Sequence, residues 1–222
     1  MKLYLFPHAC SLAPHIVLRE LALPFDLVRV DNQAKTTADG EDFLQINPKG
    51  YVAALKLDNG QVLTEASAIL QYLADLKPAA ALAPANGSWE RVRLQEWLNF
   101  IATEVHGGLA VFFNAAIQGE VRAVFQATLF KRFAVLVQTL ERQDYLLGAQ
   151  YSVADAYLFV VLRWAAFHAI DLREWPALEA FQQRVGQRPA VIAALDTESR
   201  QAEMPTHLVF IGLEGSGEDS QH

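Results

Sequence analysis

The length, charge and cysteine content of the chain already exclude several classes of protein. It has 222 residues, and 18 Lys+Arg against 25 Asp+Glu give a net charge of −7. Hydrophobic residues make up 52% of the chain and charged residues 19%, which excludes an intrinsically disordered protein and predicts one large or two small domains. An acidic chain without basic runs is a poor partner for nucleic acid. The single cysteine excludes an internal disulfide and fits a reducing, cytoplasmic compartment.

Residues 1–79 alternate between strand and helix patterns. Two short apolar strands enclose a helical segment, which predicts a parallel strand–helix–strand unit. After a loop with a helical turn, Asn59-Gly60 marks a hairpin turn, and a last helix follows. This βαβ-ββα order predicts an α/β domain with a four-stranded mixed sheet. The expected strands are 2–6, 25–30, 54–57 and 61–63, and the expected helices are 11–23 and 64–76.

The rest of the chain carries helical periodicity. Residues 80–87, rich in Pro and Ala, predict a linker, and residues 88–203 predict an all-α helical bundle. Residues 204–222 form a C-terminal extension whose apolar island is either a frayed end or a short strand or lid. No run is long and apolar enough for a signal peptide or a membrane span, so we expect no membrane partner. The expected helices are 89–109, 120–142, 152–169 and 176–187, with a capping box between Ser152 and Asp155.

Cys10 lies between the first expected strand and the first expected helix. Unpaired amides and the helix dipole at that helix start, where Ser11 is the expected N-cap, favour the thiolate. A lone cysteine is more commonly a small buried hydrophobe, but this position favours a functional interpretation. Because the chain has no second cysteine, redox chemistry would need an external thiol.

A second group of candidates comes from the helices. Asn99, Thr103 and His106 share one helix face, which is either a wall of a site or simply solvated. Glu65 begins another helix, where it either faces its own helix dipole or belongs to a small-anion cleft between two helix starts. The six histidines show no paired-ligand spacing, so we expect no metal.

Several motifs occur in a fixed order over residues 1 to about 200. They are Ala9-Cys10-Ser11-Leu12-Ala13, Asn47-Pro48-Lys49-Gly50, Leu63-Thr64-Glu65, Gln71-Tyr72-Leu73-Ala74-Asp75, Glu96-Trp97-Leu98-Asn99 and Ala154-Asp155-Ala156-Tyr157-Leu158-Phe159. With them the chain resembles the glutathione transferases, specifically the bacterial beta class. The resemblance implies a thioredoxin-like N-terminal domain, an all-helical C-terminal domain, and a homodimer that binds glutathione between the two domains of each chain.

The resemblance also implies roles for individual residues. Cys10 would lie beside the glutathione sulfur, Lys35 would meet the glycyl carboxylate, and the Val52 backbone would pair with the cysteinyl unit. Glu65 and Ala66 would hold the γ-glutamyl end. The helical domain would complete the site with Asn99, Thr103, Glu104 and His106.

Two positions depart from the family pattern. Ala53 stands where the family has a proline after a cis peptide bond. Because a cis bond before another residue costs about 2.5–4 kcal/mol, we expect a trans or displaced loop at Val52 and weaker glutathione binding. Gly107 stands where beta-class relatives often carry lysine, which removes a cation that would lower a nearby thiol pKa. The pair Gly107-Gly108 is also expected to loosen its helix.

The leading hypothesis is an enzyme that conjugates glutathione, as co-substrate, to small hydrophobic electrophiles. Ser11 and His106 would stabilise the glutathione thiolate, and Cys10 could add thiol–disulfide exchange. The alternative is a non-catalytic binding protein of the same fold. A peroxidase-like enzyme is disfavoured because there is no resolving cysteine. The second-substrate pocket would include aromatic residues that otherwise belong to the core, namely Phe112, Phe113, Trp164 and His168.

Overall fold

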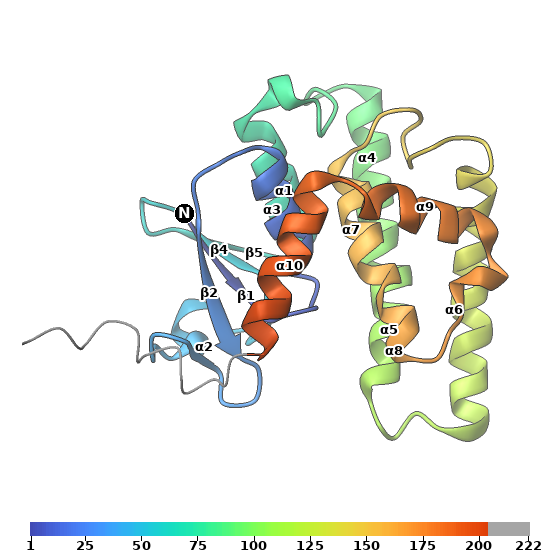
Figure 1. Ribbon diagram of the computed structural model, residues 1–222, viewed down its shortest axis with the longest axis horizontal. Coiled ribbons are helices and arrows are strands. Elements are labelled where there is room, and N and C mark those ends of the chain that lie inside the picture. The colour runs from blue at the N-terminus through green and yellow to red at the C-terminus, as the bar shows by residue number, and fades with distance from the viewer. Residues whose placement is uncertain (204–222) are drawn as a thin grey trace, which may run out of the picture.

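The computed structural model describes residues 1–203, which form a sheet-containing half followed by a helical half (Figure 1). The strands are β1 (Lys2–Leu5), β2 (Asp26–Asp31), β3 (Thr36–Thr37), β4 (Ala54–Lys56) and β5 (Val62–Thr64). The first helices are α1 (Leu12–Glu20), α2 (Phe43–Ile46), α3 (Ala66–Leu76) and the 3₁₀ turn η1 (Pro78–Ala80). The helical half contains α4 (Trp89–Phe100), the π-helix η2 (Ile101–His106), α5 (Gly107–Ala110), η3 (Val111–Phe113), α6 (Gly119–Leu140), α7 (Val153–Leu162), α8 (Trp164–Phe167), η4 (Leu172–Glu174), α9 (Pro176–Gly186) and α10 (Pro189–Glu203). The predicted order of an α/β domain and a helical domain is confirmed.

The sheet has the strand order β3-β2-β1-β4-β5. β1 and β2 are parallel, as the strand–helix–strand pattern predicts, and the other pairs are antiparallel. The expected hairpin of β4 and β5 turns at Gly60, whose φ of 84° suits glycine. The expectation of four strands is wrong, because Thr36 and Thr37 pair with the end of β2 as a fifth, edge strand. Two polar residues offer no alternating apolar pattern from which such a strand could be predicted.

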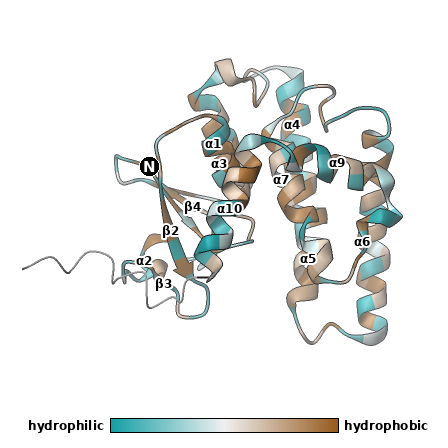
Figure 2. Ribbon diagram, viewed as in Figure 1, coloured by the Kyte–Doolittle hydropathy of each residue, from teal (hydrophilic) through white to brown (hydrophobic). Residues whose placement is uncertain are grey.

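Two helices in the middle of the molecule are buried on all sides. Every residue of α7 is buried, as are residues 12–18 of α1. α1 packs against α3, α7 and α10, and α7 packs in turn against α3, α4 and α9. Figure 2 shows α7 as a largely apolar helix beside the more polar α9. Helices that are apolar all round belong in a core, and one continuous core joins the two halves here.

The start of α7 is fixed by the predicted capping box. Asp155 is fully buried, and its carboxylate accepts hydrogen bonds from the Ser152 amide at 2.8 Å and the Ser152 hydroxyl at 2.7 Å. It also accepts one from the Leu146 amide at 2.8 Å. Burial raises the Asp155 pKa to about 6, although the three hydrogen bonds to the carboxylate act to lower it. The box therefore ties the preceding loop to the first turn of α7.

The last helix, α10, returns from the helical half and lies beside α1 (Figure 1). Its fully buried Glu198 accepts from the His8 amide at 3.1 Å and contacts His15 Nδ1 at 2.9 Å. The other ring nitrogen of His15 accepts from Arg19 Nε at 2.9 Å, so the buried imidazole is satisfied at both ends. Through Glu198, α10 thus holds the loop between β1 and α1.

Two predicted helices are interrupted. The expected helix 89–109 changes at Ile101 into the π-helix η2 before it resumes as α5, and the expected helix 152–169 breaks at Arg163 between α7 and α8. Within residues 1–203 no helix has the length and apolar character needed to cross a membrane. The predicted extension 204–222, with its apolar island, lies outside the described residues.

Candidate active site

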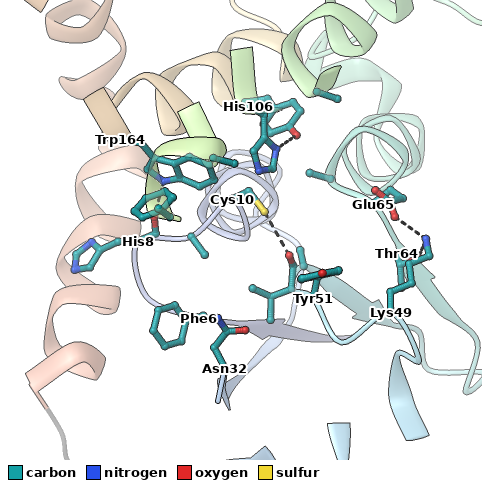
Figure 3. Close-up of a pocket in the computed structure, with 18 of the residues that line it drawn as sticks. Phe6, His8, Cys10, Asn32, Lys49, Tyr51, Thr64, Glu65, His106 and Trp164 are labelled. Atoms are coloured by element: carbon teal, nitrogen blue, oxygen red, sulfur yellow. Dashed lines mark hydrogen bonds and ion pairs between the residues drawn. The ribbon is translucent and has the colours of Figure 1, made fainter. Parts of the chain in front are cut away.

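A cavity of about 840 Å³ lies at the junction of the two halves. The sheet-containing half contributes the β1–α1 loop, the loop before β4 and the start of α3. The helical half contributes η2, α5, α7 and α8. Figure 3 shows Cys10 and His106 near its centre, Lys49 and Glu65 at one side, and Phe6, His8 and Trp164 at the other. One side of the cavity is therefore charged and the opposite side aromatic.

Cys10 reaches this cavity as a thiol. Its Sγ donates a hydrogen bond to the Val52 carbonyl at 3.4 Å, and burial raises its pKa to about 11. The predicted thiolate is wrong in this structure, because the loss of solvation outweighs the amides at the helix start. Ser11 does not reach the cavity. It is fully buried, and its hydroxyl is hydrogen-bonded to the amide and the carbonyl of Phe6, both at 3.3 Å.

The loop that carries Val52 contains a cis peptide bond although the next residue is Ala53. The Val52–Ala53 peptide bond is cis, so the expectation of a trans or displaced loop is wrong. The loop is held by its surroundings: Asn47 Nδ2 donates to the Tyr51 carbonyl at 2.6 Å, and Ala53 is buried in the core. The Val52 carbonyl lies within hydrogen-bond distance of Cys10, and the dashed line from the Cys10 sulfur marks this contact in Figure 3.

The lysine that lines the cavity is Lys49, which sequence reasoning did not single out. Its Nζ lies 2.5 Å from a Glu65 carboxylate oxygen and 3.1 Å from the Thr64 hydroxyl. Lys35 does not line the cavity, because its Nζ donates to Asn32 and to the Gly50 carbonyl, both at 2.9 Å. The Asn47-Pro48-Lys49-Gly50 motif was the signal that could have pointed to Lys49.

The start of α3 presents two predicted residues to the cavity. Glu65 precedes the helix as its N-cap residue with a φ of 73°, and its side chain does not cap the helix. Ala66, the first residue of α3, also lines the cavity. The carboxylate of Glu65 thus faces Lys49 and the cavity, which favours the cleft interpretation over a carboxylate on its own helix dipole.

The π-helix η2 divides the predicted polar stripe. A π-turn adds one residue to a helical turn and so rotates the residues after it by about 100°. His106 lines the cavity, whereas Asn99 and Thr103 are exposed and outside it. Glu104 is also outside the cavity and forms an ion pair with Arg132. Of the four residues predicted from this segment, the structure brings only His106 to the site.

His106 is held by two aromatic residues. Its Nδ1 lies 2.6 Å from the hydroxyl of Tyr157, and its ring packs edge-on against Trp164 with ring centroids 4.8 Å apart. Burial lowers the pKa of His106, which keeps the imidazole neutral. Tyr157 also lines the cavity and was missed as a site residue, although it lies within the motif of residues 154–159.

Two of the four residues predicted for the second-substrate pocket line the aromatic side of the cavity. Phe113 and Trp164 line the cavity, together with Phe6 and Phe167. Phe112 and His168 do not line it. His168 lies behind Phe113, with ring centroids 4.4 Å apart, and Phe112 packs against His168 in turn. Trp164 is fixed by its Nε1, which donates to the His8 carbonyl at 2.9 Å.

No group of three or more His, Cys, Asp or Glu side chains within residues 1–203 is arranged to hold a metal ion. The polar groups that line the cavity include the thiol of Cys10, the imidazole of His106, the phenol of Tyr157, and the charged ends of Lys49 and Glu65. Such a set can bind a zwitterionic ligand and donate hydrogen bonds to a sulfur atom.

Fold and cavity together define a class of two-domain protein, in which a thioredoxin-like domain precedes an all-helical one. Residues 9–76 match the family model of the glutathione S-transferase N-terminal domain, and residues 100–189 match that of its C-terminal domain. The chain belongs to the glutathione S-transferase family, and it is a transferase of that family.

Individual relatives agree with this assignment. The glutathione S-transferase GstA of Escherichia coli O157:H7 is 44% identical over 199 residues, covering 89% of this chain and 98% of GstA. A bacterial beta-class enzyme of Sphingomonas chungbukensis has a TM-score of 0.86 at 44% identity, covering 89% of this chain and 98% of its own. A sphingomonad glutathione S-transferase, solved in complex with glutathione, has a TM-score of 0.87 at 46% identity, covering 90% of this chain and 99% of its own. The predicted resemblance to the beta class is confirmed.

Proposed function

We propose that the protein conjugates glutathione to small hydrophobic electrophiles in the cavity between its two halves. The observation that carries this proposal is the division of the cavity into a charged side, with Lys49 and Glu65, and an aromatic side, with Phe113 and Trp164. Glutathione is charged at both ends, while an apolar electrophile prefers an aromatic wall. Cys10 and His106 lie between the two sides, where the sulfur and the electrophilic carbon would meet.

We infer that the start of α3 holds the γ-glutamyl end of glutathione. The Glu65 carboxylate suits its ammonium group, and the free amides of Ala66 and the next residue suit its carboxylate. Lys49, which now pairs with Glu65, can turn to a ligand carboxylate at little cost because the pair is half exposed. The Val52 backbone would pair with the cysteinyl unit. We assign the contact with a glutathione carboxylate to Lys49 in preference to Lys35, since Lys49 lines the cavity and Lys35 does not.

In the reaction, the glutathione thiol loses its proton to solvent and the thiolate attacks an electrophilic carbon. A sulfur–carbon bond forms from a sulfur electron pair. The bond from carbon to the leaving group breaks, and the leaving group departs with the electron pair of that bond. Neutral His106 contributes by hydrogen bonding to the sulfur, and the apolar aromatic wall strengthens that contact. Cys10 remains a thiol whose proton is directed to Val52.

Thiol–disulfide exchange is a second candidate, favoured by the presence of Cys10 in the cavity. Because the Cys10 pKa is about 11, the attacking group would be the thiolate of glutathione. It would attack a mixed disulfide between Cys10 and a second glutathione, which Cys10 acquires by exchange with a glutathionylated substrate while its proton passes to the released substrate thiolate. The attack forms glutathione disulfide and releases the Cys10 thiolate, which takes a proton from solvent. The non-catalytic alternative is not favoured, since the relatives are transferases.

We also propose a homodimer and a reducing, cytoplasmic location. Trp89 and Val92 on α4 are 69% and 48% exposed, Val124 on α6 is 66% exposed, and Tyr51 is 71% exposed. Apolar side chains of this size and exposure are typical of subunit contacts. A free thiol in the site and the need for reduced glutathione support the location. We retain the predicted boundaries of the two domains at residues 1–79 and 88–203.

The proposal is tested by narrowing the cavity. In Ala110→Trp the indole would fill the aromatic side, and we expect conjugation of glutathione to an aryl halide to fall at least roughly tenfold while the Kd for glutathione stays near that of the wild type. Ala79→Trp, on the exposed turn η1 outside the cavity, is the matched control and should leave both unchanged. Glutathione binding without turnover by the wild type would favour the non-catalytic alternative.

A further inference from the structure

We propose that Tyr157 is a positioning residue that fixes the tautomer of His106, so that the imidazole presents an N–H group to the sulfur of bound glutathione. The inference rests on the proposed conjugation reaction and adds a residue to it. The Tyr157 hydroxyl lies 2.6 Å from His106 Nδ1, and both side chains line the cavity that contains Cys10. In Figure 3 the dashed line at His106 marks this hydrogen bond.

The burial of Tyr157 determines which group donates. The side chain is only 2% exposed, and its hydroxyl has no other hydrogen-bond partner within residues 1–203. If the hydroxyl donates to Nδ1, the neutral imidazole carries its hydrogen on Nε2. The opposite tautomer would leave a buried O–H without an acceptor, which disfavours it by roughly tenfold.

Both groups remain neutral near neutral pH, so the donor and acceptor roles do not exchange. Burial raises the pKa of Tyr157, and the negative charge of Glu65 adds to that effect. Burial lowers the pKa of His106, while Glu65 acts weakly in the opposite direction. The proton of the short hydrogen bond therefore stays on the phenol oxygen, and the imidazole carries a single N–H.

The fold holds this pair in place from several directions. The π-helix η2 turns His106 toward α7, where Tyr157 is located, and the Trp164 ring limits rotation of the imidazole. α7 itself begins at the capping box of Ser152 and Asp155, so Tyr157 lies within its first two turns on a fixed start. With Nδ1 directed at Tyr157, Nε2 is left facing the cavity, near Cys10 (Figure 3).

The chemistry of His106 depends on whether its Nε2 carries a hydrogen or a lone pair. Nε2–H would stabilise the glutathione thiolate by a hydrogen bond, without taking a proton. A lone pair on Nε2 would instead make His106 a general base for the thiol. The tautomer in the resting protein decides between these roles.

The test is Tyr157→Phe, which removes one oxygen atom from a buried ring. Nitrogen-15 NMR of His106, assigned by loss of its signals in His106→Gln, should show the Nε2–H tautomer in the wild type and a mixture of tautomers in Tyr157→Phe. In conjugation assays we expect Tyr157→Phe to lower kcat about fivefold, the effect of one net hydrogen bond, with little change in KM for glutathione.

Tyr151→Phe is the matched control. Tyr151 is also buried, it precedes the same helix, and its hydroxyl makes no hydrogen bond within the described residues. The tautomer of His106 and the kcat of conjugation should both be unchanged in this variant. An Nδ1–H tautomer in the wild type, or an unchanged tautomer in Tyr157→Phe, would overturn the proposal. If Tyr157→Phe does not fold, the His106 tautomer of the wild type alone tests the proposal: Nε2–H supports it and Nδ1–H overturns it. Since the NMR measurement needs no turnover, a failure of the proposed conjugation reaction would be seen separately.

Discussion

The reactivity of Cys10 is a direct test of the electrostatics of the site. As the chain has one cysteine, alkylation by iodoacetamide adds a single mass that can only be at this residue. Burial raises its pKa to about 11 from an ordinary value of 9.0. A shift of this size reduces the thiolate fraction at neutral pH about hundredfold, and only the thiolate reacts.

We expect native protein at pH 7.5 to alkylate about a hundredfold more slowly than the urea-unfolded chain, as followed by intact mass. The native rate should still be rising with pH at pH 10, where the unfolded chain has reached its plateau. Steric protection alone would lower the alkylation rate of the native protein at every pH without moving the midpoint of its pH dependence. If the alkylation rate of the native protein has its midpoint below pH 8 and equals the rate of the unfolded chain, burial does not raise the Cys10 pKa. That result would restore a thiolate role for Cys10.

Three further substitutions test other parts of the account. Lys49→Met should raise KM for glutathione about fivefold. Because the ion pair of Lys49 is exposed, the free energy of unfolding in urea should change by less than about 0.5 kcal/mol. A stability loss with unchanged KM would contradict a binding role. Glu198→Gln should cost about 2 kcal/mol in the same unfolding experiment, because an amide oxygen cannot replace two carboxylate oxygens that accept from His8 and His15. Glu20→Gln, at the more accessible pair with Arg188, should cost less, and an equal loss would argue against the Glu198 network. Gly107→Lys fits sterically, since a Cβ there would meet only the Ala102 carbonyl at 3.8 Å, and its cation should lower the midpoint of the pH profile of conjugation by roughly one pH unit; an unmoved midpoint would contradict it.

Local patterns predicted the parts of the fold that local physics controls. The capping box of Ser152 and Asp155, the hairpin turn at Gly60 and the placement of Cys10 at a helix start were all predicted from short stretches of sequence. Each depends on backbone preferences or on a side chain that satisfies its own helix end. The order of the main elements, apart from the edge strand β3, followed from periodicity together with turn residues.

The errors at the site come from tertiary effects. A single π-turn, which no residue in 101–106 announces, rotated His106 away from Asn99 and Thr103. Similarly, the charge state of Cys10 depends on burial by segments far away in the chain, and helix-start amides alone predicted the wrong sign for its pKa shift. Tyr157 could have been found only by knowing that α7 packs against η2.

We propose that the glutathione thiolate, and not Cys10, is the nucleophile in conjugation. The most direct measurement compares wild type with Cys10→Ala in two assays, conjugation to an aryl halide and reduction of a glutathione mixed disulfide. We expect Cys10→Ala to retain conjugation within about threefold, while any disulfide exchange falls at least about tenfold. Loss of conjugation by about a hundredfold or more, with glutathione still bound and exchange unaffected, would contradict it.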